Sequence, residues 1–129
     1  MPGRERVQAF IDAVTAGRFL ASIDEFYSDD ATAQENLKET LRGRAALIAN
    51  EEKALRGVRT MFTHPAPTFL VDGDHVVIHW RFDMTGHDGV TRRLDELTLQ
   101  TWRGDRIASE RFFYDPGSIA PVAVAADGK

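Results

Sequence analysis

The chain has 129 residues, of which 43% are apolar, and it carries a formal net charge of −4. A chain of this size and apolar content can bury one hydrophobic core without disulfides or metals, so we expect a single domain. It contains no cysteine, which excludes disulfide frameworks, thiol nucleophiles and thiolate metal sites.

The rest of the composition narrows the possible functions further. The four histidines lack a ligand spacing such as HExxH, so we expect no bound metal. Because the net charge is negative and the arginines are scattered, we expect no nucleic-acid binding. No glycine-rich phosphate loop is present, and we therefore expect no cofactor. No apolar run reaches the ~20 residues that span a bilayer, and the N-terminus leads into a helix; both features predict a cytoplasmic protein without membrane contact.

The first half of the chain reads as helical. Apolar residues at helical spacing predict a helix over 4–16 that ends at Gly17, followed by a second over 19–27. A third helix is predicted over 44–55, directly after Gly43. Between them, residues 28–30 have the composition of a turn, and 31–37 predict a weak strand.

From residue 58 onward the pattern alternates, which predicts strands over 58–71, 75–86, 94–102 and 107–114. Pro65 and Pro67 interrupt the first of these and favour an edge strand or a bulge. Helices followed by an antiparallel meander indicate an α+β domain over 1–117, with helices packed on one face of a curled sheet. Residues 118–129 have no periodicity and read as a C-terminal tail.

Several stretches resemble one family. FYSDDATAQEN follows the opening helices, GRAAL begins the third, and LDELTLQTWRGDRI leads into GDRIASERFFYDP. This order is similar to the SnoaL-like (polyketide cyclase-like) branch of the nuclear transport factor 2-like superfamily. The resemblance implies a cone-shaped α+β fold with a small-molecule pocket, and often a homodimer. It does not imply one activity, because the superfamily includes isomerases, cyclases, epoxide hydrolases and non-catalytic binding proteins.

The resemblance also implies which residues face the pocket. In ketosteroid isomerase and limonene epoxide hydrolase relatives, alternate residues of the last two strands line it. That parity carries over to Glu96, Thr98, Gln100 and Trp102 on one strand, and to Ala108, Glu110, Phe112 and Tyr114 on the other. The final-strand aspartate of the epoxide hydrolases falls on Phe112 here, which argues against epoxide hydrolysis by that mechanism.

The register of the last hairpin decides whether Glu96 and Glu110 lie on the same face of the sheet. A two-residue loop at Gly104-Asp105 would place Glu96 and Glu110 on opposite faces. A three-residue loop, or a bulge, would instead bring Gln100 opposite Glu110. The family parity favours the second register.

If both carboxylates share the pocket, its apolar wall would raise their pKa toward the range used in acid–base catalysis. Glu110 is then the candidate proton-transfer group and Glu96 its orienting partner, with Gln100 and Tyr114 as hydrogen-bond donors to a substrate oxygen. The candidate ligand-binding residues are Tyr27, Asn36, His79, Trp80, Phe82, Gln100, Trp102, Phe112 and Tyr114. The expected partner is a small hydrophobic ligand, such as an apolar carbonyl or polyketide-like compound, acted on by a cofactor-independent isomerase, cyclase or hydrolase-like enzyme.

Two other readings remain open. Either glutamate could pair with Arg81, Arg92 or Arg93 on the outer face, which would leave a non-catalytic ligand-binding or dimerisation module. The outer face itself carries apolar residues that a partner could cover, and a homodimer through this face is the expectation. These residues are Val77, Leu97, Leu99 and Phe113.

Overall fold

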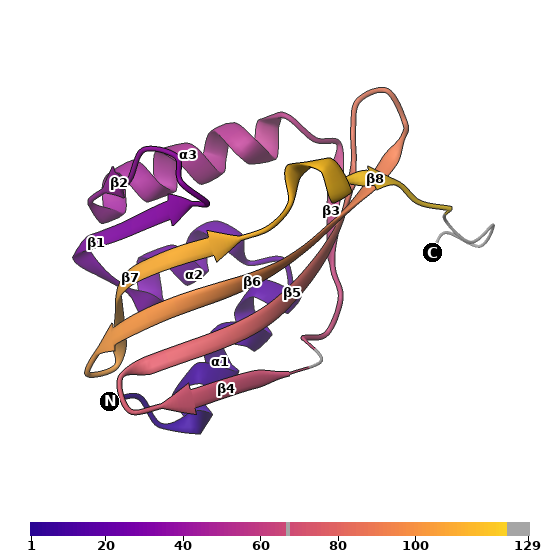
Figure 1. The fold of residues 1–129 in the computed structure, drawn as a ribbon. Helices are drawn as coiled ribbons and strands as arrows, with labels where there is room; N and C mark the ends of the chain where they lie inside the picture. Colours follow the sequence, from indigo (N-terminus) through magenta and orange to yellow (C-terminus); the bar gives the residue numbers. More distant parts are fainter. Residues whose placement is uncertain (67, 124–129) are drawn as a thin grey trace.

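Helices cover one face of a strongly curled sheet (Figure 1). The computed structural model describes residues 1–66 and 68–123. The helices are α1 (Arg4–Thr15), α2 (Phe19–Phe26) and α3 (Arg44–Arg56), each within two residues of the predicted bounds. Gly17, with φ of 83°, follows α1 in the left-handed conformation that glycine adopts without strain. The α+β class predicted from the sequence is therefore confirmed.

The sheet is mixed, with the order β2-β1-β7-β6-β5-β3, while β4 pairs with β5 and β8 pairs with β6. Its strands are β1 (Tyr27–Glu35), β2 (Leu41–Arg42), β3 (Thr60–Thr63), β4 (Phe69–Asp72), β5 (His75–Thr85), β6 (Thr91–Arg103), β7 (Arg106–Phe113) and β8 (Ala120–Pro121).

Strand β1 differs most from its prediction. It begins at Tyr27, so the expected turn at 28–30 is part of the strand, and it pairs in parallel with β7. Ala31 and Ala33 are buried in a strand that packs against α3, whereas Asp29 and Asp30 are exposed. Of the polar residues that indicated a turn, Asp29 and Asp30 are solvent-facing positions of the strand, whereas Ser28 is buried and its hydroxyl donates to the Ile107 carbonyl.

The strand predicted over 58–71 is divided into two, and Pro67, one of the two prolines expected to interrupt it, lies outside the described residues. β3 and β4 both pair antiparallel with β5, but with different halves of it, and the segment between them contains Pro65. Proline cannot donate to a ladder, so it separates two short edge strands. The predicted edge position is confirmed.

A β-bulge sets the faces of the last hairpin. The loop is the two-residue Gly104-Asp105 turn, since Arg103 pairs with Arg106 and Trp102 with Ile107. The register then shifts, so that Thr101 pairs with Ser109 and leaves Ala108 as the extra residue. As a result Ile107, not Ala108 as expected, is fully buried, and Glu110 still faces inward beside it.

Two short elements of secondary structure lie between residues 116 and 121. Pro116–Ser118 form a 3-10 turn, and β8 pairs with Arg92 and Arg93 of β6. Secondary structure thus reaches residue 121, within the C-terminal tail predicted over 118–129, and residues 124–129 of that tail lie outside the described residues. Pairing with β6 is possible because β6 begins three residues before the predicted strand.

The core lies between the helices and the inner face of the sheet. Phe10 of α1 makes edge-on aromatic contacts with Phe26, Tyr27, Trp80 and Trp102. Strand β6 alternates sharply: Thr98 and Gln100 are fully buried, while Leu97 and Leu99 are 49% and 40% exposed. Among residues 1–66 and 68–123, no helix is long and apolar enough to cross a membrane.

Candidate functional site

A cavity of about 320 Å³ opens between the inner face of the sheet and the helices. Most of its wall is apolar and aromatic, and its polar residues include four glutamates. Its lining residues are Phe10, Val14, Phe19, Ser22, Ile23, Tyr27, Ala33, Glu35, Leu41, Leu47, Asn50, Glu51, Ala54, Met61, Trp80, Phe82, Met84, Leu94, Glu96, Glu110 and Phe112.

Glu110 of β7 is 5% exposed and both of its carboxyl oxygens are engaged. The hydroxyl of Tyr27 donates to Oε1, and Nε2 of Gln100 donates to Oε2 at 2.7 Å. Burial raises the pKa of Glu110 to about 7, although these two hydrogen bonds favour the charged form and oppose the rise. A carboxyl with a pKa near neutrality can both accept and return a proton.

Behind Glu110, Trp102 fixes the orientation of Gln100. Its indole Nε1 donates to Oε1 of Gln100 at 2.9 Å, which turns the amide nitrogen toward Glu110. Gln100 and Trp102 are both fully buried. The pair therefore forms a fixed support that presents an N–H to the carboxylate.

Glu96 of β6 is 6% exposed, lines the same cavity, and has no hydrogen-bond partner among the described residues. Burial raises its pKa to about 8, and the negative charges of Glu110, Glu35 and Glu51 add to the rise. Near pH 7 its side chain is accordingly a neutral acid with a free donor and a free acceptor facing the cavity.

Two further carboxyl groups line this space. Glu35 of β1 is exposed and Glu51 of α3 is partly exposed. Burial raises the pKa of Glu51, and the charge of Glu35 raises it further. No lysine, arginine or histidine is among the described residues that line the cavity.

The arginines of the outer face pair with aspartates, not with either glutamate. Arg93 donates to Asp83 at 2.8 Å and Arg81 donates to Asp95 at 3.2 Å. The hydrogen bond from Arg93 holds the pKa of Asp83 below its usual range. Because aspartates satisfy these arginines, the alternative in which Glu96 or Glu110 is neutralised there does not hold.

The predicted ligand-binding residues fall into separate groups. Tyr27, Trp80, Phe82 and Phe112 line the cavity beside the two glutamates. Gln100 and Trp102 lie behind the wall, as described above. His79 lies on the outer face, where Nε2 is 2.6 Å from Asp95 Oδ1, so its expected position at the cavity is corrected. Its strand alternates, and Trp80 takes the inward position.

Asn36 and Tyr114 meet at the end of β1 and β7. Oδ1 of Asn36 accepts from the Tyr114 backbone N–H at 3.0 Å, and Asn36 has a φ of 50°. The Tyr114 hydroxyl donates to Glu35 at 2.7 Å, a contact that raises its pKa to about 12. Neither side chain lines the cavity, which corrects their expected placement; Tyr114 reaches it only through Glu35.

Sequence reasoning missed part of the site. The pairing of Tyr27 with Glu110 had no local signal, because 83 residues separate them. Glu51 was also missed, although its position four residues after buried Leu47 places both on one face of α3. That spacing was the signal that could have identified it.

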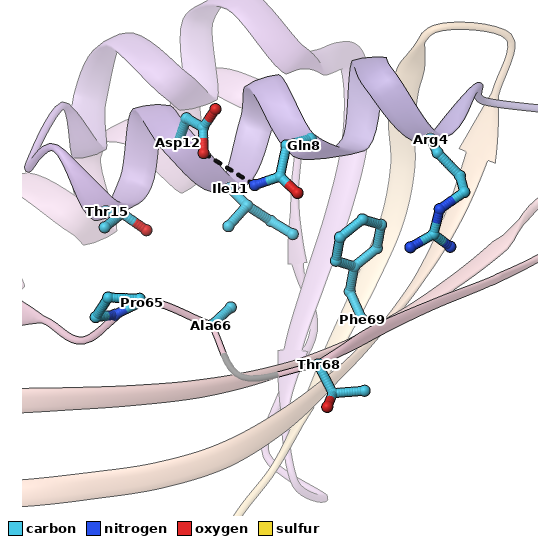
Figure 2. A pocket seen from close by; sticks show the side chains of 9 residues that line it. All are labelled: Arg4, Gln8, Ile11, Asp12, Thr15, Pro65, Ala66, Thr68 and Phe69. Atoms are coloured by element: carbon cyan, nitrogen blue, oxygen red, sulfur yellow. Dashed lines mark hydrogen bonds between the residues drawn. The ribbon is translucent and has the colours of Figure 1, made fainter.

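A second hollow of about 400 Å³ lies between α1 and the segment that leads into β4 (Figure 2). Gln8 of this hollow donates to Asp12 at 2.9 Å, the Arg4 guanidinium lies 4.3 Å from the centre of the Phe69 ring, and the side chains of Arg4, Gln8 and Asp12 are exposed. It contains none of the predicted site residues. Among residues 1–66 and 68–123, no group of three or more His, Asp and Glu side chains is arranged to hold a metal ion.

Comparison with known proteins identifies the fold. The family profile described as "SnoaL-like domain" matches residues 7–110. A candidate SnoaL-like polyketide cyclase from Mesorhizobium loti superposes with a TM-score of 0.74 at 22% identity, covering 88% of this chain and 100% of that one. A ketosteroid isomerase-like protein from Catenulispora acidiphila, crystallised with trimethylamine, gives 0.75 at 21% identity, covering 89% and 88%. TerC, co-crystallised with polyporic acid, gives 0.75 at 20% identity, covering 89% and 92%. No curated protein sequence matches this chain.

Proposed function

The chain belongs to the family of SnoaL-like domains, and from that premise we propose that its cavity binds a small, largely apolar organic molecule on which Glu110 transfers a proton. The substrate class is an apolar carbonyl or polyketide-like compound, and the reaction is an isomerisation, cyclisation or hydrolysis-like step without a cofactor. The observation that carries the proposal is the state of Glu110: buried at the cavity wall, with hydrogen bonds from Tyr27 and Gln100 and no basic side chain among the described residues that line the cavity.

The proposed step follows from this arrangement. Ionised Glu110 removes a proton from the carbon beside the carbonyl, the electron pair of that C–H bond forms the new C=C bond, and the π pair of the C=O bond moves to the oxygen as an enolate forms. Protonated Glu110 then returns the proton to the same or a neighbouring carbon. A pKa of about 7 suits both directions near neutral pH. Glu96, which has no hydrogen-bond partner among the described residues, orients the substrate.

Known relatives support a small-molecule ligand without naming it. Polyporic acid is the co-crystallised compound of TerC, and trimethylamine that of the Catenulispora protein. Both proteins share the fold of this chain at 20–21% identity. The cavity volume of about 320 Å³ is at the small end of ordinary ligand pockets.

Proton transfer can be tested without the natural substrate. We expect the protein in D₂O to incorporate deuterium into the α-carbon of 2-tetralone faster than buffer alone, as followed by proton NMR. Glu110→Gln should lower this rate by about 10²–10⁴-fold, while exposed Glu39→Gln should leave it unchanged. If 2-tetralone raises the melting temperature but exchanges no faster than in buffer, the protein is a binding module without chemistry.

We also propose a homodimer through the outer face of the sheet. Leu97 pairs across the ladder with Phe113, and these side chains are 49% and 39% exposed. Leu99, 40% exposed, extends the same apolar surface. A continuous apolar face on paired strands is a surface that association would remove from water.

A further inference from the structure

The charges of the cavity point to a more specific ligand than an apolar molecule. We propose that the ligand carries an organic ammonium group, which is held against Glu96 while its apolar part packs on the aromatic wall. This inference rests on the proposed function only in taking the cavity as the ligand site. It does not depend on whether Glu110 catalyses a reaction.

The first observation is Glu96 itself. Glu96 is only 6% exposed and lines the cavity. No described residue donates a hydrogen bond to it. Glu110, by contrast, has Tyr27 and Gln100 on its two oxygens. A buried carboxyl without a partner is costly, so it indicates a group that is supplied from outside the protein.

The second observation is the sign of the charge on the residues that line the cavity. Glu35 of β1, Glu51 of α3, Glu96 of β6 and Glu110 of β7 all line it, and its remaining titratable lining residue is Tyr27. No basic side chain balances them among the described lining residues. The potential inside is therefore negative, and a cation gains from every one of these groups, whereas a neutral molecule of the same shape does not.

The third observation is the chemistry of the wall. Trp80 and Phe82 stack with ring centres 5.7 Å apart, and Trp80 pairs across the ladder with Glu96. Aromatic faces next to a carboxylate attract organic ammonium ions through cation–π contacts as well as by charge. A metal ion would instead need several oxygen ligands around one point, and no such group exists among the described residues.

Binding of a cation should also change the protonation of Glu96. Burial and the charges of Glu110, Glu35 and Glu51 raise its pKa to about 8, so at pH 7 it is mostly neutral in the empty pocket. An ammonium ion beside it favours the carboxylate, and the proton leaves to solvent. Binding should therefore release about one proton at pH 7, whereas a neutral ligand should release none.

The test compares benzylammonium with benzyl alcohol, which have similar shape and differ in charge. We expect benzylammonium to bind at least about tenfold more tightly by isothermal titration calorimetry, and titration in phosphate and Tris buffers should show the released proton. In Glu96→Gln the preference for benzylammonium should fall, with only the part that Glu35, Glu51 and Glu110 supply remaining. Retained binding of benzyl alcohol would show that the pocket is intact. Glu39→Gln should behave as wild type.

The outcomes separate this inference from the proposed function. Equal affinities, a preference for benzyl alcohol, or no binding of benzylammonium to the wild-type protein would overturn the inference, whatever the exchange of 2-tetralone shows. A preference for benzylammonium that is undiminished in Glu96→Gln would also overturn it. A preference that falls in Glu96→Gln would support it even if Glu110 transfers no proton.

Discussion

Gln100 lies directly opposite Glu110 in the ladder between β6 and β7, and its Nε2 donates to Oε2 of Glu110 at 2.7 Å. The opposition depends on the bulge at Ala108, because a regular strand after the two-residue turn would have placed the two side chains on different faces. With the bulge, Ile107 packs into the core and Glu110 also faces inward, three residues later. The one extra residue at the bulge therefore allows Ile107 to pack in the core and Glu110 to face the cavity.

Tyr27→Phe should raise the pKa of Glu110 further. The hydrogen bond from Tyr27 favours the carboxylate form of Glu110 and so lowers its pKa, whereas burial raises it. Without the hydroxyl, the effect of burial is opposed only by the hydrogen bond from Gln100. We also expect a loss of roughly 1 kcal/mol in the free energy of unfolding, the usual effect of one hydrogen bond. Carbon-detected NMR titration of the glutamate carboxyls measures the pKa. Tyr114→Phe is the matched control, since Tyr114 donates to Glu35 instead; an unchanged Glu110 pKa in Tyr27→Phe would contradict the assignment.

Trp102→Phe should act on Glu110 through Gln100. Without the indole N–H, Oε1 of Gln100 loses its donor in a fully buried site, at a cost of about 1–3 kcal/mol in stability. The amide is then free to turn its oxygen toward Glu110, which favours the protonated form and raises the pKa of that carboxyl. The NMR titration should detect this shift together with a lower melting temperature. A fall in stability with no shift in the Glu110 pKa would mean that Trp102 serves packing alone.

The elements that the sequence predicted well are those with one buried face. The helices and β6 show a clear period because inward and outward positions differ strongly in burial, as Gln100 and Leu99 do. Strand β1 was poorly predicted, since its pairing with β7 joins residues far apart in the chain and overrides the turn-like composition of 28–30. Non-local pairing leaves little trace in local composition.

The site was predictable in part for a related reason. Parity along β6 and β7 correctly brought Glu96 and Glu110 to one face, but only the bulge explains why, and no local pattern distinguishes a bulge from a longer loop. His79 is not at the cavity because adjacent strand residues face opposite ways, and its neighbour Trp80 takes the inward position. The Tyr27 contact required the parallel pairing of β1 with β7, which brings Tyr27 beside Ile107.

Stability should fall as the pH rises from about 4.5 to about 8. In the unfolded chain Glu96 and Glu110 titrate near 4.5, while in the folded protein their pKa values are about 8 and about 7. Between these values the folded state holds more protons than the unfolded state, so raising the pH favours unfolding, by up to about 1.4 kcal/mol per pH unit for each group. The stabilisation is fully present below pH 4.5 and is lost above the folded pKa values.

Glu96→Gln tests this dependence, because glutamine resembles the neutral acid and does not ionise. We expect the variant to lose part of the pH slope and to be more stable than wild type at pH 8, with little difference at pH 5. Urea denaturation at pH 5, 6, 7 and 8 measures both free energies of unfolding. Glu39→Gln, at an exposed position, should keep the wild-type slope. A variant with an unchanged slope would show that Glu96 has an ordinary pKa and reaches water.

Leu97→Lys should dissociate the proposed homodimer. Leu97 is 49% exposed on the outer face and pairs with Phe113, so a charge there would be buried against the partner's apolar surface without compensation. Sedimentation velocity at micromolar concentration should show the wild-type protein as a dimer and the variant as a monomer. Leu37→Lys is the control, because Leu37 is 86% exposed in the turn after β1 and lies outside the paired strands β6 and β7. If the wild-type protein sediments as a monomer, the apolar outer face does not mediate self-association.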